Sequence, residues 1–297
     1  MMKEKHLLSP SIKDAARQVG LKARFENGRL MTEPVVPRPP IVEGCMADDS
    51  DFCLWVVDGS HRADGHPILS VEQMKRAAER YRLGKSRSGK TIFWMIDETG
   101  TMRDGRIGNS WVSVMLKARE PELERYWCVK HCLFGLHLLA EKDFLFSPAE
   151  MKEMKESHAV CDSSSLAEKN ISFISFISAG HKPSICIVEK EKSAVILSEV
   201  FPDYIWMATV TPMNFTLERL EPLRGCQVKL FPHTDFTMST YLWWVEMAEE
   251  ARRKLHLDIS VSSILEDSTS EEQKQREIDL VDFLFPGLNP NYNGYGL

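Results

Sequence analysis

The fold of this chain is decided by the stretch Ser184-Ile-Cys-Ile-Val-Glu-Lys-Glu-Lys-Ser-Ala-Val-Ile-Leu-Ser-Glu-Val200. Residues 184–188 are mostly apolar and β-branched, which predicts a short strand buried on both faces. A helical pattern begins at Lys192 and continues to Val200. A buried strand that leads directly into a helix is typical of a parallel sheet, because parallel neighbours need a crossover connection.

The same alternation of strand and helix continues to residue 284. We therefore expect an α/β fold in which residues 184–286 form a mainly parallel four-stranded sheet with helices on both faces. The expected strands are 184–188, 204–208, 227–231 and 258–262, and the expected helices are 192–200, 217–223, 238–255 and 271–284. The longest helix should face the sheet with one apolar stripe, made of Met238, Tyr241, Leu242, Val245, Ala248 and Ala251.

An α+β region is expected before this unit, over residues 67–183. Ser70 and Gln73 form a capping box at the start of a helix, which Gly84 is expected to end. Residues 91–96 and 101–107 predict an antiparallel hairpin. The polar, serine-rich residues 147–182 are expected to form a helix and a surface insertion.

The N-terminal region contains short elements. We expect a helix over 11–19, a hairpin turn at Asn27-Gly28, a proline-rich strap over 33–40 and a strand over 52–57. The chain is thus expected to divide into segments 1–66, 67–183, 184–286 and a disordered tail, 287–297.

The charge balance argues against a protein that coats nucleic acid with its whole surface. The 297 residues include 37 Lys and Arg against 43 Asp and Glu, a formal net charge of −6. The stretch from Lys75 to Arg106 is locally basic, which indicates either a binding groove or a solvated face. The nucleic-acid-binding candidates are Arg82, Lys85, Arg87, Lys90 and Lys192.

Cysteine usage and hydropathy indicate a cytoplasmic protein. The 7 cysteines include no Cys-x-x-Cys pair, so we expect reduced thiols rather than a disulfide scaffold or a zinc ribbon. We find neither a run of about 18 apolar residues nor a secretory signal, and we expect no membrane partner.

The segment Gly84-Lys-Ser-Arg-Ser-Gly-Lys-Thr91 matches the G-x-x-x-x-G-K-[ST] pattern of a phosphate-binding loop. That chemistry needs a strand before the loop and a helix after it, so that helix amides converge on the phosphate. Here the order is reversed, so no helix amino end should face the glycines. We therefore interpret the segment as a basic turn in which Lys90 binds no nucleotide phosphate.

Cys128, His131, Cys132 and His137 lie close together in the sequence, which raises the alternative of a zinc site. Their spacing fits no familiar zinc knuckle, and Cys132 and His137 lie inside an apolar run. We favour buried thiols and a hydrogen-bonded core histidine.

Carboxylates follow the expected parallel strands at their carboxyl ends, where open α/β sheets place functional groups. Glu189 follows the first strand and Asp235 the third, while Asp279 and Asp282 lie in the last helical segment. The alternative is that Glu189 and its neighbours only cap or pair at a helix start.

Further motifs lie between Val71 and Phe285. They are Tyr81–Gly84, Thr91-Ile-Phe-Trp-x-Ile-Asp97, Arg103-x-Gly-Arg-Ile107, Cys132-Leu-Phe-Gly-x-His-Leu-Leu139, Ile187-Val-Glu-Lys-Glu-Lys-Ser193, Phe201-Pro-x-Tyr-Ile-Trp-x-Ala-Thr209 and Leu230-Phe-Pro232. In these motifs the chain resembles the Toprim-like, primase-related proteins of bacterial mobile elements, a family long carried as a domain of unknown function. The resemblance implies a Toprim-like, Rossmann-like fold for residues 184–286.

The resemblance also implies a magnesium site, because Toprim domains bind this ion through a glutamate after the first strand and an Asp-x-Asp pair after the third. Glu189 matches the glutamate and Asp235 the second aspartate, both as catalytic residues, while His233 occupies the place of the first aspartate. Since imidazole is a poor magnesium ligand, we expect Glu189, His233 and Asp235 to hold Mg²⁺ or Mn²⁺ only weakly. Val210-Thr211 stands where relatives have Gly-Gly, and no four-cysteine zinc ribbon precedes the region.

The expected function is therefore that of a degenerate Toprim protein with no certain cofactor. The leading interpretation is a non-catalytic or weakly catalytic participant in DNA replication or transfer, which binds single-stranded or primed DNA or a replication or mobilisation protein. The alternatives are a divalent-metal-dependent nuclease or primase, and a protein-interaction module without DNA binding.

Overall fold

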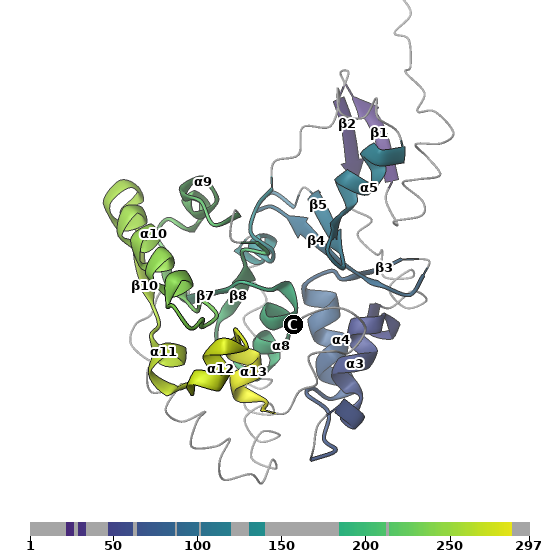
Figure 1. Cartoon of the computed structure of the whole chain (residues 1–297). Helices are drawn as coiled ribbons and strands as arrows, with labels where there is room; N and C mark the ends of the chain where they lie inside the picture. The colour runs from purple at the N-terminus through teal and green to yellow at the C-terminus, as the bar shows by residue number, and fades with distance from the viewer. Residues whose placement is uncertain are drawn as a thin grey trace, which may run out of the picture.

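In the computed structural model of this chain, two four-stranded sheets and a two-stranded hairpin are connected by helices (Figure 1). The predicted helix 11–19, the proline-rich segment after Glu33, the insertion 147–182 and the tail 287–297 lie outside the described residues. The structure describes residues 22–26, 29–33, 47–61, 64–86, 88–100, 102–119, 131–139, 184–211 and 214–286.

The strands of the C-terminal half form one parallel sheet, as predicted. They are β7 (Ser184–Val188), β8 (Ile205–Ala208), β9 (Gln227–Leu230) and β10 (Asp258–Val261). Their order is β10-β9-β7-β8, and all three pairings are parallel. The side chains of residues 185–188 in the central strand β7 are all buried, which explains its continuous apolar sequence. The mixed α/β fold is confirmed.

Right-handed crossovers place helices on opposite faces of this sheet. The connection from β7 to β8 through α8 (Glu191–Val200) and the connection from β9 to β10 through α10 (Ser239–Leu255) run in opposite directions across the sheet. Because both connections are expected to be right-handed, α8 and α10 cover different faces. Between β8 and β9 lie α9 (Leu217–Leu220) and the 3₁₀ turn η7 (Glu221–Leu223).

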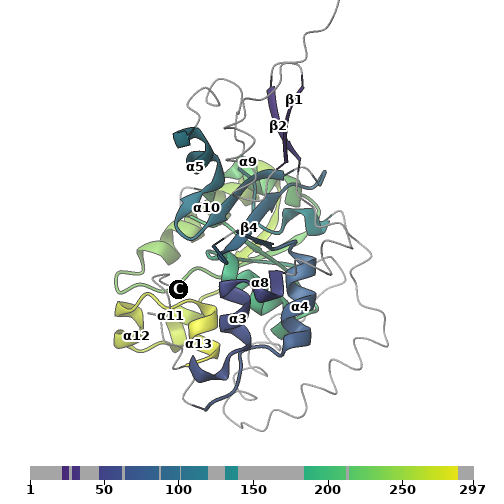
Figure 2. The same cartoon turned by 90° about the vertical axis from the view of Figure 1, so that its right-hand side faces the viewer.

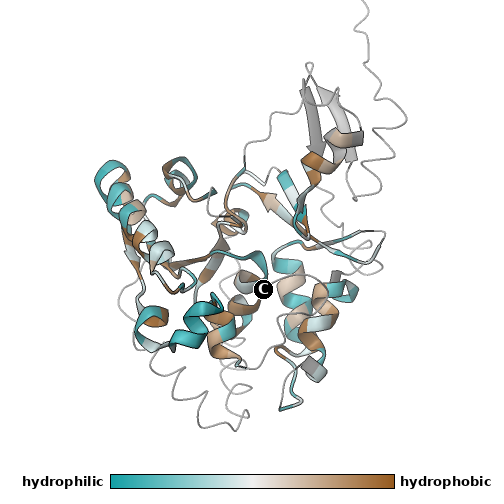
Figure 3. Ribbon diagram, viewed as in Figure 1, coloured by the Kyte–Doolittle hydropathy of each residue, from teal (hydrophilic) through white to brown (hydrophobic). Residues whose placement is uncertain are grey.

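Two helix predictions were wrong in detail. The predicted helix 271–284 is two short helices, α12 (Glu271–Gln275) and α13 (Leu280–Leu284), preceded by α11 (Ile264–Ser268). The Asp279 side chain accepts hydrogen bonds from the N–H groups of Val281 and Asp282 and so starts a new helix. In Figure 3, α12 is coloured as hydrophilic, in agreement with its lack of buried residues.

Only some residues of the apolar stripe predicted for α10 are buried. Ala248 and Ala251 are buried as expected, but Leu242 is 54% exposed and Met238 is also exposed. The buried anchor is Trp244, which stacks on Phe215 at 4.6 Å between ring centroids. Periodicity alone did not predict that this large indole would set the orientation of the helix.

The second sheet is antiparallel and lies in the N-terminal half. Its strands are β3 (Gly84–Lys85), β4 (Thr91–Ile96), β5 (Met102–Ile107) and β6 (Ser110–Trp111), in that order, followed by α5 (Val112–Arg119). The strands β1 (Lys22–Glu26) and β2 (Arg29–Glu33) pair antiparallel, as the predicted hairpin requires, and its turn, Asn27-Gly28, lies outside the described residues.

The helices of this half correct two expectations. Residues 52–57 belong to α3 (Asp51–Val57), not to a strand, because their buried positions Phe52, Cys53 and Val56 follow helical spacing while Leu54 is exposed. The short turns η1 (Ala47–Asp49) and η2 (Gly59–His61) flank α3. Ser70 and Gln73 form the predicted capping box of α4 (Val71–Arg80), but Gly84 lies in β3 rather than at the helix end. Figures 1 and 2 show α4 beside α8 and α3 beside α4.

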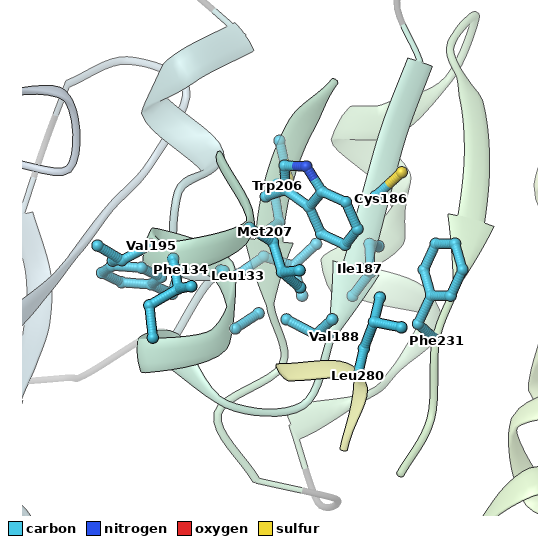
Figure 4. Packing of buried hydrophobic residues seen from close by; sticks show 14 of the residues in the cluster. Leu133, Phe134, Cys186, Ile187, Val188, Val195, Trp206, Met207, Phe231 and Leu280 are labelled. Carbon is cyan, nitrogen blue, oxygen red and sulfur yellow. The ribbon is translucent and has the colours of Figure 1, made fainter. Parts of the chain in front are cut away.

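A segment in the middle of the chain connects the two sheets. Phe134 pairs with Ala208 of β8 through two backbone hydrogen bonds of 2.9 and 3.0 Å, next to the 3₁₀ turn η4 (Leu136–Leu139). The Tyr81 ring stacks on Phe134 at 5.1 Å, and its hydroxyl donates to the Trp206 carbonyl at 2.7 Å. Figure 4 shows Leu133 and Phe134 packed beside Trp206 and Met207.

One hydrophobic core therefore spans both sheets, from Phe52 to Phe285. A buried ion pair adds to it, because Glu199 of α8 accepts from Arg76 at 3.0 Å and lies 3.2 Å from Arg80. The predicted division at residue 183 remains a prediction, but packing is continuous across it. None of the helices in the described ranges is long and apolar enough to cross a membrane.

Tyr81→Phe tests the connection between the sheets. We expect a loss of about 1–3 kcal/mol in the free energy of unfolding, because the buried Trp206 carbonyl loses its hydroxyl donor. Urea denaturation would measure this loss. The control Tyr241→Phe changes a half-buried tyrosine for which the described part of the chain shows no hydroxyl hydrogen bond, so a change within about 0.5 kcal/mol is expected. Equal effects of the two substitutions would contradict the assignment.

Candidate site at the carboxyl edge of the parallel sheet

The loops that follow β7, β8 and β9 meet at one edge of the sheet. Thr209 N–H donates to the Val188 carbonyl at 3.0 Å, and Val210 N–H donates to the Glu189 carbonyl at 2.7 Å. Phe231, directly after β9, donates to the Ile187 carbonyl at 2.8 Å. The residues that follow these three strands therefore lie next to one another, as expected at the carboxyl edge of an open parallel sheet.

Glu189 and His233 are in direct contact at this edge. The Nδ1 atom of His233 forms a short hydrogen bond with Oε2 of Glu189, and both side chains are more than four-fifths buried. The other ring nitrogen, Nε2, lies 3.3 Å from the Thr240 hydroxyl. The structure therefore brings together two of the three residues of the predicted metal set.

The electrostatics of this pair favour a protonated imidazole. Burial alone would lower the pKa of His233, but the hydrogen bond that His233 donates to Glu189 and the negative charge of Glu189 outweigh burial and raise this pKa above its usual value. The imidazole of His233 thus lies beside Glu189, where a divalent cation would lie in a metal site.

Asp235, the third predicted residue, is engaged in the start of α10. Its carboxylate accepts hydrogen bonds from the N–H groups of Thr237, Ser239 and Thr240 at 2.8–3.1 Å and from the hydroxyls of Thr237 and Ser239. Burial would raise the pKa of Asp235, but these hydrogen bonds lower it strongly. Each carboxylate oxygen thus already has donors, which a metal ion would have to displace.

Metal binding by Glu189, His233 and Asp235 stays a prediction. Within the described ranges, no group of three or more His, Cys, Asp or Glu side chains is arranged to hold a metal ion. Mg²⁺ requires several oxygen ligands in an octahedron, whereas here one of the three groups is an imidazole and one carboxylate caps a helix.

Val210 has a backbone conformation that favours glycine. Its φ is +74°, a region that a β-branched residue occupies only under strain. The guanidinium of Arg106 donates to the Val210 carbonyl at 2.9 Å and lies 3.6 Å from the carboxylate of Glu191. The glycine that the resemblance implies at this position would fit the backbone without strain.

Further carboxylates lie beside the start of α8. Glu191 is buried, which raises its pKa, and its Oε1 atom has no hydrogen-bond partner among the described residues. Asp279 accepts a hydrogen bond from the Ser193 hydroxyl at 2.5 Å. Burial and the neighbouring Asp279 raise the pKa of Asp282 to about 6. Asp279 and Asp282 form a capping box, so their first role is to start α13.

The predicted nucleic-acid-binding residues are distributed over several elements. Lys85 forms an ion pair with Asp49, and Lys90 is exposed in the loop between β3 and β4. Arg82 is half-buried behind α4, and Arg87 lies outside the described residues. Lys192 packs 6.0 Å above the Phe52 ring, where burial lowers its pKa to about 8.

The phosphate-loop pattern forms a hairpin between β3 and β4. The expectation that no helix amino end faces the glycines was wrong. The amino end of α3 approaches Gly89, because Asp51 N–H donates to the Gly89 carbonyl at 2.9 Å. The first amides of α3 are nevertheless occupied, since Phe52 N–H donates to the Asp51 carboxylate and to the Thr91 hydroxyl. These amides are not available to a phosphate.

The histidines near residue 130 have separate partners. His137 is a core histidine, as favoured, with Nε2 3.0 Å from the Arg80 carbonyl and a pKa that burial lowers to about 4. Cys132 is a buried free thiol whose pKa burial raises to about 12, and Cys128 lies outside the described residues. His131 is half-buried and bonds to Asp104 at 2.8 Å, a partner that sequence reasoning missed.

Together these features define a mixed α/β protein with a polar site at the carboxyl edge of its parallel sheet. A family model described as "Domain of unknown function (DUF6371)" matches residues 66–148 and 149–234, more than half of the chain. The chain belongs to this family. No curated protein and no solved structure matches it.

His233→Gln tests the charge state of the Glu189–His233 pair. The pKa of His233 is higher in the folded protein than in the unfolded chain, where it is about 6.5. Protonation of His233 therefore stabilises the fold fully below about pH 6.5, and this stabilisation is lost as the pH rises through the folded-state pKa. We expect the variant to lose about 1–2 kcal/mol near pH 6 and less near pH 9, measured by urea denaturation. The control His66→Gln changes an exposed histidine. A loss that grows with pH would contradict the protonated pair.

Lys90→Ala tests the phosphate-loop pattern. We expect no magnesium-dependent ATP binding by the parent protein in calorimetry and no change in the variant, because the amides nearest the loop already have acceptors. Tight ATP binding that Lys90→Ala removes would overturn the hairpin interpretation.

Proposed function

We propose that this chain is a Toprim-like, primase-related protein that binds nucleic acid at the carboxyl edge of its parallel sheet, without efficient metal-dependent phosphoryl transfer. The contact between His233 and Glu189 carries the proposal. This contact supports a site in which the imidazolium of His233, rather than a bound metal ion, supplies the positive charge beside Glu189. The imidazolium repels a divalent ion. The site also offers such an ion one oxygen ligand fewer, because His233 stands in place of an aspartate.

The geometry of the edge supports the binding of an anionic strand. Arg106 reaches the edge from β5, and its side chain is 21% exposed beside Val210. Guanidinium groups are well suited to phosphate because they present several N–H donors in one plane. A role in the replication or transfer of a mobile element rests on the sequence resemblance and is part of the proposal.

DNA binding separates this function from its alternatives. Fluorescence anisotropy with single-stranded, duplex and primed DNA, at two salt concentrations, would be measured with and without Mg²⁺ or Mn²⁺. We expect binding that weakens with salt, that needs no metal, and that is accompanied by neither cleavage nor primer synthesis. Metal-dependent cleavage or synthesis would replace the proposal with a nuclease or primase. The lack of any DNA binding would favour the protein-interaction module.

Restoring the missing ligand tests the degenerate site directly. The triple variant His233→Asp, Val210→Gly, Thr211→Gly adds a carboxylate and removes the strained valine. We expect its Mg²⁺ affinity, measured by calorimetry, to exceed that of the parent by about tenfold or more, because the added charge and oxygen ligands favour a hard cation. The control replaces His233→Asp with His233→Asn, which adds no charge. Equal affinity in the folded triple variant and the parent would contradict the proposal.

A further inference from the structure

One face of the antiparallel sheet presents a histidine beside an arginine. Asp104 and Arg106 are two residues apart on β5 and so point to the same face. Trp111 of β6 lies directly opposite Arg106 in the register and shares that face. The ring of His131 stacks on Trp111, with 4.1 Å between centroids and 18° between planes.

Asp104 fixes the orientation of His131. Its carboxylate is fully buried and accepts hydrogen bonds from Gly105 N–H at 2.8 Å and from Ser113 N–H at 3.0 Å. The Ser113 hydroxyl donates to the second oxygen at 2.6 Å, and His131 Nε2 lies 2.8 Å from the same oxygen. Because the carboxylate of Asp104 can only accept, the hydrogen bond between them requires a proton on Nε2 of His131. Nδ1 is then the ring nitrogen that can bond to a ligand.

The backbone of His131 is also held in place. Arg219 of α9 donates from Nε to the His131 carbonyl at 3.1 Å. The His131 side chain retains 21% exposure, so its position is fixed while part of the ring is accessible. Asp104 on β5 contacts this imidazole, Arg219 on α9 contacts the His131 carbonyl, and the neighbouring thiol of Cys132 is buried.

Arg106 connects this face to the carboxyl edge of the parallel sheet. Its Nε atom donates to the Gly108 carbonyl at 2.9 Å, and one terminal nitrogen, NH1, donates to the Val210 carbonyl. NH2, the other terminal nitrogen, has no hydrogen-bond partner in the part of the chain that the structure describes. An arginine held at two of its nitrogens with the third available is a pre-organised donor for a phosphate oxygen.

We propose that His131 and Arg106 form a subsite for a phosphodiester group of a single-stranded DNA, next to the Glu189–His233 pair. This inference rests on the proposed nucleic-acid binding and names the contacts that hold the strand. Protonated His131 donates from Nδ1 to a phosphate oxygen, and Asp104 acts as its positioning residue. Neutral His131 presents a lone pair at the same atom and repels the phosphate, so the protonated form is the one that binds.

The test measures the affinity of a fluorescein-labelled oligothymidylate of about 20 nucleotides for the full chain, by anisotropy, near pH 6 and near pH 8.5. We expect the parent to bind about five- to tenfold more tightly at the lower pH, and His131→Gln to lose most of this difference. The slope of log affinity against log salt should fall by about 0.7 in the variant, as for one lost phosphate contact on a single strand. His66→Gln, at an exposed histidine, should behave as the parent.

A second measurement uses the parent protein alone, in case His131→Gln destabilises the fold. Diethyl pyrocarbonate modifies accessible imidazoles, and mass spectrometry of the digested protein reports the rate at His131. The oligonucleotide should slow this rate several-fold and leave the rate at His66 unchanged.

The outcomes are distinct for the two proposals. No oligonucleotide binding at either pH would overturn both. Binding by the parent with an unchanged pH dependence and salt slope in folded His131→Gln, or without protection of His131, would overturn the subsite and leave the proposed function in place.

Discussion

The backbone pairing of Phe134 with Ala208, covered by Tyr81, is the contact on which the rest of the structure depends. It occupies the open edge of β8, which would otherwise expose unpaired N–H and C=O groups. The same contact attaches the antiparallel sheet to the parallel one, because Tyr81 follows α4 and its hydroxyl is bonded to β8. Arg106 reaches Val210 only because the two sheets are held in this arrangement.

The polar groups at the carboxyl edge of the parallel sheet have partners within the protein. His233 has an internal counter-ion, Glu189, and Asp235 has a full set of donors from the start of α10. Both arrangements satisfy groups that would be costly to bury without partners. The polar groups of this edge are therefore satisfied by protein partners, without a cation.

Sequence reasoning succeeded where local pattern determines structure. The short apolar strands predicted the parallel sheet, and the motifs of the family that the chain resembles predicted that Glu189 and His233 lie close together. It failed at residues 52–57, where a six-residue apolar run fits a strand as well as a helix. The bond between Asp104 and His131 joins residues that are 27 apart along the chain, and no spacing rule indicates it. For Asp235 a signal existed, since Asp before Thr and Ser at a helix start is a capping pattern.

The hydrogen bonds of Asp235 explain why an aspartate stands at this position. An aspartate that ends a strand loop and starts a seventeen-residue helix is maintained by the need for a stable fold alone. The presence of an aspartate at position 235 is therefore explained by the fold and is not in itself evidence for catalysis.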